Sequence, residues 1–457
     1  MIRVRARTQR RHGLDKLHLD VLAAMNEALV AADPVRIIRK QLRLNKATLL
    51  VDGLQFPLKD FQRIFVIGGG KASGHMAEEV ERLLGKWITR GLVIIPGYLL
   101  PKPRGRRIRY RLATHPIPTR KGMNASLAML RLVENISRDD LVIVLLSGGG
   151  SALMPLPVAG INLNDEARVT SLLLKSGANI EEINTVRKHL SQVRGGRLAE
   201  QLYPATVLSL IISDVVGDKI DAIASGPTVP DPTTYHDAEQ VLKRYDLWSQ
   251  IPKNARKVIT QGLSGSIPET PKRKSKVFRR VHNLIVGNNR ASCLAAASAM
   301  SKAGYRTQIL SIQITGEARE VGQIFGSIAR GIRENGLPYH SPAALIAGGE
   351  TTVTVRGKGK GGRNQELALA AAMKIRGSEG VVVGAFSTDG IEGRTDAAGA
   401  VADGSTINRG LRLGMDPEEF LRKNNSYHYF SRLKDLVVTG PTGANVNDIA
   451  ILAADDR

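Results

Sequence analysis

The sequence of 457 residues has little of several things that would define its class at once. Its single cysteine, Cys293, excludes a disulfide framework and a zinc site built from several cysteines, so we expect a reducing, cytoplasmic setting. No apolar run approaches the roughly 18 residues of a membrane-spanning helix, so no membrane partner is expected. Aromatic residues make up only 4% of the chain, which leaves few rings on which nucleic-acid bases could stack.

Positive charge, in contrast, is abundant. Lysine and arginine number 65 against 42 acidic residues, a formal net charge of +23, and most of the excess lies in residues 1–16, 101–111 and 272–280. Blocks of this kind are usually solvated tails and edges. In the second block, arginines alternate with Ile108 and Tyr110, which predicts an exposed edge strand guarded by charge. We therefore expect no specific nucleic-acid partner, and a basic nucleic-acid-associated protein is only the third hypothesis for function.

The hydrophobic pattern indicates an α/β protein. Continuous Val, Ile and Leu runs alternate with helical segments, as in parallel sheets that helices cover on both faces. The predicted strands are residues 63–67, 91–95, 141–146, 205–212, 281–286, 305–312, 343–347, 381–386 and 435–439. Residues 343–347 and 351–355 are also expected to form a hairpin-like pair, and residues 18–44 a helix.

These elements predict three parts of the chain. A basic N-terminal arm (1–16) precedes an N-terminal Rossmann-like domain (17–265), and a Pro-, Gly- and Lys-rich connection leads to a C-terminal α/β domain (281–457). The simplest architecture is two Rossmann-like domains with largely parallel sheets that face a central cleft. Self-association into a homo-oligomer is left open.

A glycine-rich loop follows the first predicted strand. Gly68, Gly69 and Gly70 precede Lys71 and a helix, an arrangement in which backbone N–H groups can cradle an anion. The loop is not a Walker A motif, because Phe65 stands where that motif has glycine and Ala72 where it has Ser or Thr. A dinucleotide-binding loop would need an acid at the end of the next strand, and the chain has Pro96 and Gly97 there. An ordinary turn with a solvated lysine is the alternative.

A second loop of the same kind follows the strand 141–146. It consists of Ser147, Gly148, Gly149, Gly150 and Ser151. Serine hydroxyls and glycine N–H groups suit a phosphate or a carboxylate, so two anion cradles in one sheet suggest a phosphoryl donor and an acceptor. A tight turn between strand and helix is the alternative.

Two further features lie between this loop and the domain connection. Arg187, Leu190 and Arg194 share one face of a predicted helix, which is either a solvated basic face or part of a site. Asp214 lies just past the end of strand 205–212, where open α/β sheets bind ligands. Its carboxylate could hold Mg²⁺, which takes few protein ligands, or could simply cap a helix.

The C-terminal half supplies candidates of other types. Arg363 and Asn364 follow a run of glycines and begin an apolar helix, where an arginine can stabilise the charge of a migrating phosphoryl group. Asp389 follows the strand 381–386 in a glycine-bounded loop and could bind a metal or accept a hydroxyl proton.

Seven motifs, in order along the chain, resemble those of the glycerate 2-kinase family, whose C-terminal part is known as the MOFRL domain and some of whose members were labelled hydroxypyruvate reductases. They are FVIGGGKASGHMAEEVE, THPIPT, LLSGGGSALMPLP, INTVRKHLSQVRGGRLAE, ISDVVGDKIDAIASGPTVPDPTTY, GGETTVTVRGKGKGGRNQELALAAA and STDGIEGRTDAAGAV.

The resemblance implies ATP-dependent phosphorylation of D-glycerate at its 2-hydroxyl, with Mg²⁺, in a cleft between two Rossmann-like domains. It also implies that Lys71 and Arg363 are catalytic, because they match the lysine and arginine of the family's motifs. Of the carboxylates, Asp389 is predicted as the base and Asp214 as the metal ligand, although the sequence does not order them. An NAD(P)-dependent hydroxypyruvate reductase is the second hypothesis, weakened by Lys71 in the phosphate loop and by the missing ribose-binding acid.

Overall fold

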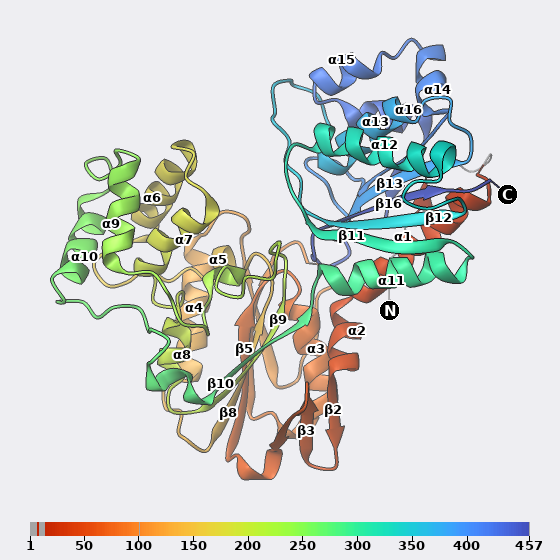
Figure 1. The fold of residues 1–457 in the computed structure, drawn as a ribbon. Coiled ribbons are helices and arrows are strands. Elements are labelled where there is room, and N and C mark those ends of the chain that lie inside the picture. The colour runs from red at the N-terminus through yellow and green to blue at the C-terminus, as the bar shows by residue number, and fades with distance from the viewer. Residues whose placement is uncertain (1–6, 9–13, 100, 457) are drawn as a thin grey trace. The chain divides into compact units, whose positions relative to one another are not determined.

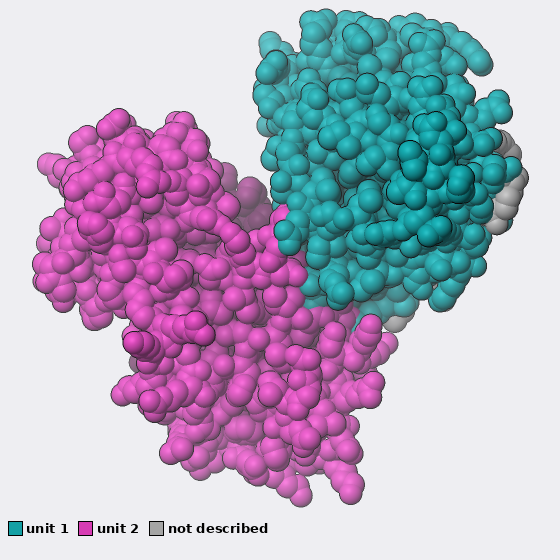
Figure 2. Space-filling model, in the orientation of Figure 1, with its two compact units in different colours: residues 1–36, 287–457 teal, residues 37–286 magenta. Residues whose placement is uncertain are grey.

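The computed structural model describes residues 7–8, 14–99 and 101–456. The chain divides into two compact units (Figure 2), of which unit 1 comprises residues 1–36 and 287–457 and unit 2 comprises residues 37–286. Both units combine a β-sheet with flanking helices, so the predicted α/β class is confirmed. No helix of the described part of the chain is both long enough and apolar enough to cross a membrane.

Unit 2 contains a six-stranded sheet in the order β10-β9-β8-β5-β6-β7. Its strands are β5 (Arg63–Gly69), β6 (Arg90–Pro96), β7 (Ile108–Ala113), β8 (Asp140–Leu146), β9 (Thr206–Ile212) and β10 (Val281–Gly287). The pairs β5–β6, β5–β8, β6–β7 and β8–β9 are parallel, as predicted. The carboxyl ends of β5, β8 and β9 therefore meet at one edge of the sheet, and the two glycine loops and Asp214 follow them.

Helices and a small second sheet complete unit 2. The helices are α3 (Ser73–Leu84), α4 (Arg120–Leu132), α5 (Gly150–Leu153), α6 (Leu163–Lys175), α7 (Ile180–His189), α8 (Arg197–Gln201), α9 (Tyr235–Arg244) and α10 (Lys253–Leu263), and the small sheet contains β2 (Leu42–Asn45), β3 (Thr48–Val51) and β4 (Leu54–Pro57). Helices α6, α7, α9 and α10 gather around an apolar core of their own (Figure 1), separate from the core of the six-stranded sheet.

Unit 1 contains a seven-stranded sheet in the order β1-β15-β14-β13-β16-β12-β11. Its strands are β1 (Arg7–Thr8), β11 (Arg306–Ile314), β12 (Ala343–Gly349), β13 (Val381–Ser387), β14 (Gly399–Asp403), β15 (Leu436–Val438) and β16 (Asp448–Ala454). Only the pair β11–β12 is parallel, and the other five neighbouring pairs are antiparallel. The expectation of a largely parallel sheet is thus wrong for this unit, because strands buried on both faces read as continuous apolar runs whatever their direction.

Helices cover both faces of this sheet (Figure 1). Helices α1 (Lys16–Ala32) and α11 (Asn289–Lys302) lie on one face, and α12 (Ala318–Asn335) and α13 (Arg363–Lys374) on the other. The remaining helices are α14 (Thr406–Arg412), α15 (Pro417–Arg422) and α16 (Ser426–Leu433). Together they bury the central strands β12, β13 and β16 completely.

The structure corrects the predicted domain boundaries in two places. Helix α1, which was assigned to the N-terminal domain, packs its buried face into the core of unit 1. Met25 of α1 belongs to the same apolar cluster as Val401 of β14, and its Cε would lie 2.3 Å from a Cβ at Gly384 of β13. Strand β10, assigned to the C-terminal domain, joins the sheet of unit 2 beside β9. An apolar stripe predicts that a helix or strand is buried but does not identify the sheet that buries it.

Two predicted elements also differ. The helix expected over 18–44 ends at Ala32, because Asp33 is extended before Pro34, and α2 (Pro34–Gln41) and β2 follow. The predicted hairpin of 343–347 and 351–355 is wrong, since β12 pairs instead with β11 and β16. Within 351–355, all of which the structure describes, only Thr352 forms a bridge, and its partner is Glu317.

The basic blocks have different outcomes. Most of the predicted arm 1–16 lies outside the described residues, although Arg7–Thr8 form β1 and pair with β15. The 101–111 block includes β7, which lies at an edge of its sheet with Arg109 and Arg111 exposed. The predicted edge strand is therefore confirmed.

Candidate active site

The first glycine loop leaves β5 so close to β8 that no side chain would fit. Gly68 has φ +139°, and a Cβ there would lie 2.1 Å from the carbonyl oxygen of Leu145. At Gly70, with φ +156°, a Cβ would lie 2.2 Å from Ser147 Oγ. Glycine is required at both positions because this backbone conformation and this close approach both exclude a side chain.

The two glycine loops are hydrogen-bonded to each other. Lys71 N donates to the Gly148 carbonyl oxygen at 2.8 Å, and Ala72 N donates to Ser147 Oγ at 3.0 Å. Ser147 is only 1% exposed, and its hydroxyl also lies 3.1 Å from Ser73 Oγ. The two loops predicted as separate anion cradles, 68–71 and 147–151, are therefore brought together.

His115 is a neighbour of Lys71 that the sequence-based prediction missed. A Cβ at Gly149 would lie 2.9 Å from His115 Nε2 and 3.2 Å from Lys71 Cγ, so both side chains border this glycine. Burial and the nearby Lys71 ammonium lower the pKa of His115 to about 4. His115 is therefore neutral near pH 7 and can donate or accept one hydrogen bond beside the lysine. It stands in the THPIPT motif, where no spacing rule pointed to it.

Asp214 follows β9 and borders the same loops. A Cβ at Gly148 would lie 1.9 Å from Asp214 Oδ2, so the carboxylate packs directly against this glycine. In the described part of the chain no cluster of three or more His, Cys, Asp or Glu residues could hold a metal ion. A single carboxylate beside a phosphate-sized loop still fits Mg²⁺, which binds through one or two carboxylates and completes its shell with phosphate oxygens and water.

The candidate site of unit 1 is an arginine held between two carboxylates. Arg363, the first residue of α13, donates from Nε and Nη2 to both oxygens of Asp448 at 2.5 and 3.0 Å. Its Nη1 donates to Glu350 Oε1 at 2.6 Å, and Asn447 Nδ2 holds the other oxygen of Glu350 at 2.9 Å. The Arg363 side chain is 28% exposed, so it is fixed in position but not fully enclosed.

Glu392 accepts hydrogen bonds from the backbone at the start of α13. Its carboxylate accepts from Asn364 N and, at 3.2 Å, from Gln365 N, two of the backbone donors that a helix N-terminus leaves unpaired. Glu392 is 4% exposed, and burial next to Asp448 raises its pKa to about 8. Burial also raises the pKa of Asp448, to about 6, although Arg363 opposes this shift. Asn364 itself is 2% exposed.

Asp389 lies at the same edge of the sheet. It stands two residues past Ser387, whose strand partner is Asp448. Its Oδ1 accepts from Ser387 Oγ at 2.8 Å and from Ile391 N at 3.2 Å, bonds within its own loop. Arg363, Asn364 and Asp389 are thus gathered around the ends of β12, β13 and β16.

The sequence-based prediction missed the carboxylates around Arg363. Glu350, Glu392 and Asp448 lie 13 to 85 residues from their partners, and none stands in a pattern that predicts a role. The one available signal was position, because Glu350 ends the GGE motif directly after a buried strand.

Comparison with known proteins gives the family. Residues 20–260 match a family described as "Domain of unknown function (DUF4147)", and residues 343–448 match the MOFRL family. The chain is 43% identical to "Glycerate 2-kinase" of Pyrococcus horikoshii over 94% of its own length and 96% of that protein. It is 42% identical to a protein of Agrobacterium vitis named "Putative hydroxypyruvate reductase", over 85% of its length and 86% of that protein.

A solved structure agrees. The crystal structure of a glycerate kinase from Thermotoga maritima superimposes with a TM-score of 0.84 at 39% sequence identity, covering 96% of this chain and 99% of the other. Sequence identity and fold thus agree over almost the whole length, and the MOFRL family matches the C-terminal part. The chain belongs to the glycerate 2-kinase family, with a MOFRL domain in its C-terminal part.

Proposed function

We propose that this protein is a phosphotransferase that moves the γ-phosphoryl group of ATP to the 2-hydroxyl of D-glycerate, giving 2-phosphoglycerate and ADP. The observation that supports this most is the pair of glycine loops, joined by the hydrogen bond from Lys71 N to the Gly148 carbonyl oxygen, with Lys71 at their border. Loops of this kind, with an adjacent lysine, suit a phosphate group.

In the reaction, the oxygen of the 2-hydroxyl forms a bond to the γ-phosphorus while the bond to the oxygen that bridges the β- and γ-phosphates breaks. The hydroxyl proton passes to the carboxylate of Asp389. Lys71 and Arg363 serve the same reaction by neutralising the negative charge that shifts toward the bridging oxygen and the equatorial oxygens. A single cleft formed by both units stays a prediction.

Mg²⁺ would be held by Asp214 and, when bound, neutralises phosphate charge and orients the phosphate oxygens. The loops around Gly68 and Gly148 leave no room for side chains where they pass each other, so their backbones are in direct contact. Neutral His115 beside Lys71 leaves the lysine ammonium as the charged group at this point.

The test is an assay with D-glycerate, ATP and Mg²⁺ that follows ADP release and identifies the product by phosphorus NMR. We expect 2-phosphoglycerate from the wild type and a loss of about 10³-fold in kcat for Lys71→Ala. Lys121→Ala, an exposed lysine of α4 in the same unit, is the matched control and should retain activity. Consumption of NADH or NADPH with hydroxypyruvate, without ADP release, would instead support the second hypothesis.

A further inference from the structure

The basic face of α7 and the segment after it is the one sequence motif that the proposed function leaves unused. Arg194 is buried, 1% exposed, and its Nη1 forms an ion pair with Glu166 of α6. Its Nη2 donates to the Ser151 carbonyl oxygen at 2.8 Å. Arg194 is thus a fixed structural cation that ties the second glycine loop to the helices of unit 2.

The predicted shared helical face is wrong, because α7 ends at His189 and Arg194 lies in the segment after it. Arg187 lies on α7 itself and, unlike Arg194, has no such pairing. Its Nε is buried and has no hydrogen-bond partner within the described part of the chain, and no carboxylate there forms an ion pair with it. Neighbouring Lys188 is already neutralised by Asp221 at 3.1 Å and Asp231 at 3.5 Å. Burial and the charge of Arg194 lower the pKa of Arg187 to about 9. A half-buried guanidinium without a partner is unfavourable, and an anion beside it would remove that cost.

The charges of this cluster match an anion with a single charge. Arg187 and Arg194 are two cations, and Glu166 is the one carboxylate that influences both. One positive charge therefore remains for a ligand. A carboxylate fits this surplus and the planar fork of a guanidinium, whereas a triphosphate carries several negative charges and suits the lysine loop better.

Hydrogen-bonded side chains lead from α7, the helix that carries Arg187, to the second glycine loop. Asn184 lies one helical turn before Arg187 on α7, and its Oδ1 accepts from Ser225 Oγ at 3.0 Å. The Ser225 hydroxyl lies 2.7 Å from Ser151 Oγ, at the end of the second glycine loop. Arg187 therefore lies one helical turn from a hydrogen-bonded path of side chains that ends at the second glycine loop.

We propose that Arg187 binds the carboxylate of the hydroxy-acid substrate and so fixes which end of D-glycerate is turned away from the phosphoryl donor. This assignment rests on the proposed function. Arg194 and Glu166 act as positioning residues, since their ion pair is neutral overall and Arg194 holds the Ser151 carbonyl oxygen.

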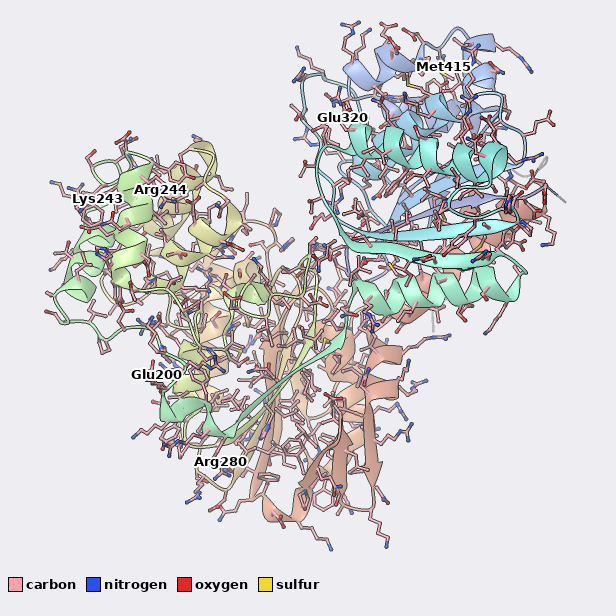
Figure 3. The ribbon with its side chains drawn as sticks, in the orientation of Figure 1. Glu200, Lys243, Arg244, Arg280, Glu320 and Met415 are labelled. Atoms are coloured by element: carbon pink, nitrogen blue, oxygen red, sulfur yellow. The ribbon has the colours of Figure 1, made fainter. Side chains whose placement is uncertain are left out.

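The experiment compares Arg187→Gln with the wild type in steady-state kinetics. We expect KM for D-glycerate to rise about 10- to 100-fold, because a charge-assisted hydrogen bond to the carboxylate is lost, while KM for ATP stays within about twofold. Arg187→Lys should recover part of the affinity and serves if the glutamine variant fails to fold. Arg244→Gln is the matched control: this exposed arginine of α9, labelled in Figure 3, pairs with Glu182 and should leave both KM values unchanged.

A neutral substrate analogue separates carboxylate binding from structural damage. The wild type should bind glyceramide more weakly than D-glycerate by the same factor that Arg187→Gln loses, and the variant should no longer distinguish the two. A rise in KM for ATP, or equal discrimination by variant and wild type, would overturn the assignment. If the wild type forms no 2-phosphoglycerate, the proposed function fails instead, and calorimetric titration of D-glycerate into wild type and variant still decides whether Arg187 binds the acid.

Discussion

The two candidate sites are built from different groups: one mainly from backbone, the other mainly from charged side chains. In unit 2 the site is mainly backbone: glycines 68–70 and 148–150 bring N–H groups and carbonyls of two loops into contact, and Lys71 borders them. In unit 1 the site is mainly side chains, because Arg363 is held by the carboxylates of Asp448 and Glu350. In the first site, close backbone contact leaves no room for added atoms. In the second site, the paired carboxylates fix the position of the Arg363 guanidinium.

This difference predicts how each site responds to substitution. A backbone site tolerates no additional atom, so substitution of its glycines should cause misfolding. Arg363 is already paired with two carboxylates, so it can stabilise a phosphoryl group only if these pairs hold the guanidinium in place while it also contacts the phosphate. The second site should therefore lose activity before it loses stability.

The largest effect is expected for Gly68→Ala. The new Cβ would lie 2.1 Å from the Leu145 carbonyl oxygen, so β5 and β8 would have to separate, at a cost of more than about 3 kcal/mol. Gly177→Ala is the control, since Gly177 also has a positive φ, +80°, but nothing within 4 Å of the added atom. It should cost only about 1 kcal/mol. Urea denaturation of both variants measures the difference, and equal losses would contradict the role of close packing.

Arg363→Lys should have the next largest effect, on activity rather than stability. A lysine ammonium cannot hold both oxygens of Asp448 and also contact Glu350, so the charge would shift from its place. We expect kcat to fall about 100-fold while the melting temperature changes by no more than a few degrees. Arg330→Lys on α12, an exposed arginine paired with Glu334, is the control. A full loss of folding in Arg363→Lys would show that the cluster is structural.

The glycine-loop site could be predicted from the sequence because its parts are local. A buried strand, a glycine run and a helix follow one another within twenty residues, and parallel strands bring the second loop to the same edge. The arginine site could be predicted only in part. Arg363 stands at a recognisable helix start, but Asp448 lies 85 residues away in a strand whose antiparallel direction no apolar pattern reveals.

The same reason explains the misplaced helix α1. Its apolar stripe predicted burial, but the helix packs on the sheet of unit 1, most of whose strands lie more than 250 residues further along the chain. His18 Nε2 lies 3.0 Å from Asp403 Oδ2 and His18 Nδ1 lies 2.8 Å from Asp15 Oδ1. Burial lowers the pKa of His18, but these two accepting carboxylates outweigh it, so the pKa is raised. A long-range ion pair of this kind leaves no periodic trace in a sequence.

A third prediction concerns pH and Glu392. Because burial raises the pKa of this carboxyl from its ordinary value of 4.5 to about 8, the folded state binds the proton more tightly than the unfolded state. The stabilisation is complete below about pH 4.5 and is lost as the pH rises through about 8. Relative to wild type, Glu392→Gln should therefore gain up to about 4 kcal/mol in free energy of unfolding between pH 5 and pH 9, since each pKa unit corresponds to about 1.4 kcal/mol.

Urea denaturation at several pH values gives this difference. Glu320→Gln, an exposed glutamate of α12 labelled in Figure 3, is the matched control in the same unit. A parallel shift of the Glu392→Gln curve at all pH values would mean that only a hydrogen bond to Asn364 N or Gln365 N was lost.

The smallest effects are expected for the two aspartates that follow strands in the two units, and these effects should differ in kind. Asp214 packs against Gly148 in the backbone site, whereas Asp389 is bonded within a loop beside the arginine site. If Asp214 holds Mg²⁺, Asp214→Asn should raise the Mg²⁺ concentration needed for half-maximal rate about tenfold, and excess Mg²⁺ should restore kcat. If Asp389 accepts the hydroxyl proton, Asp389→Asn should lower kcat at least about tenfold at every Mg²⁺ concentration. Steady-state kinetics over a series of Mg²⁺ concentrations distinguishes the two roles. The opposite pattern would exchange them, because each carboxylate follows the end of a strand in its own unit and either could serve as metal ligand or base.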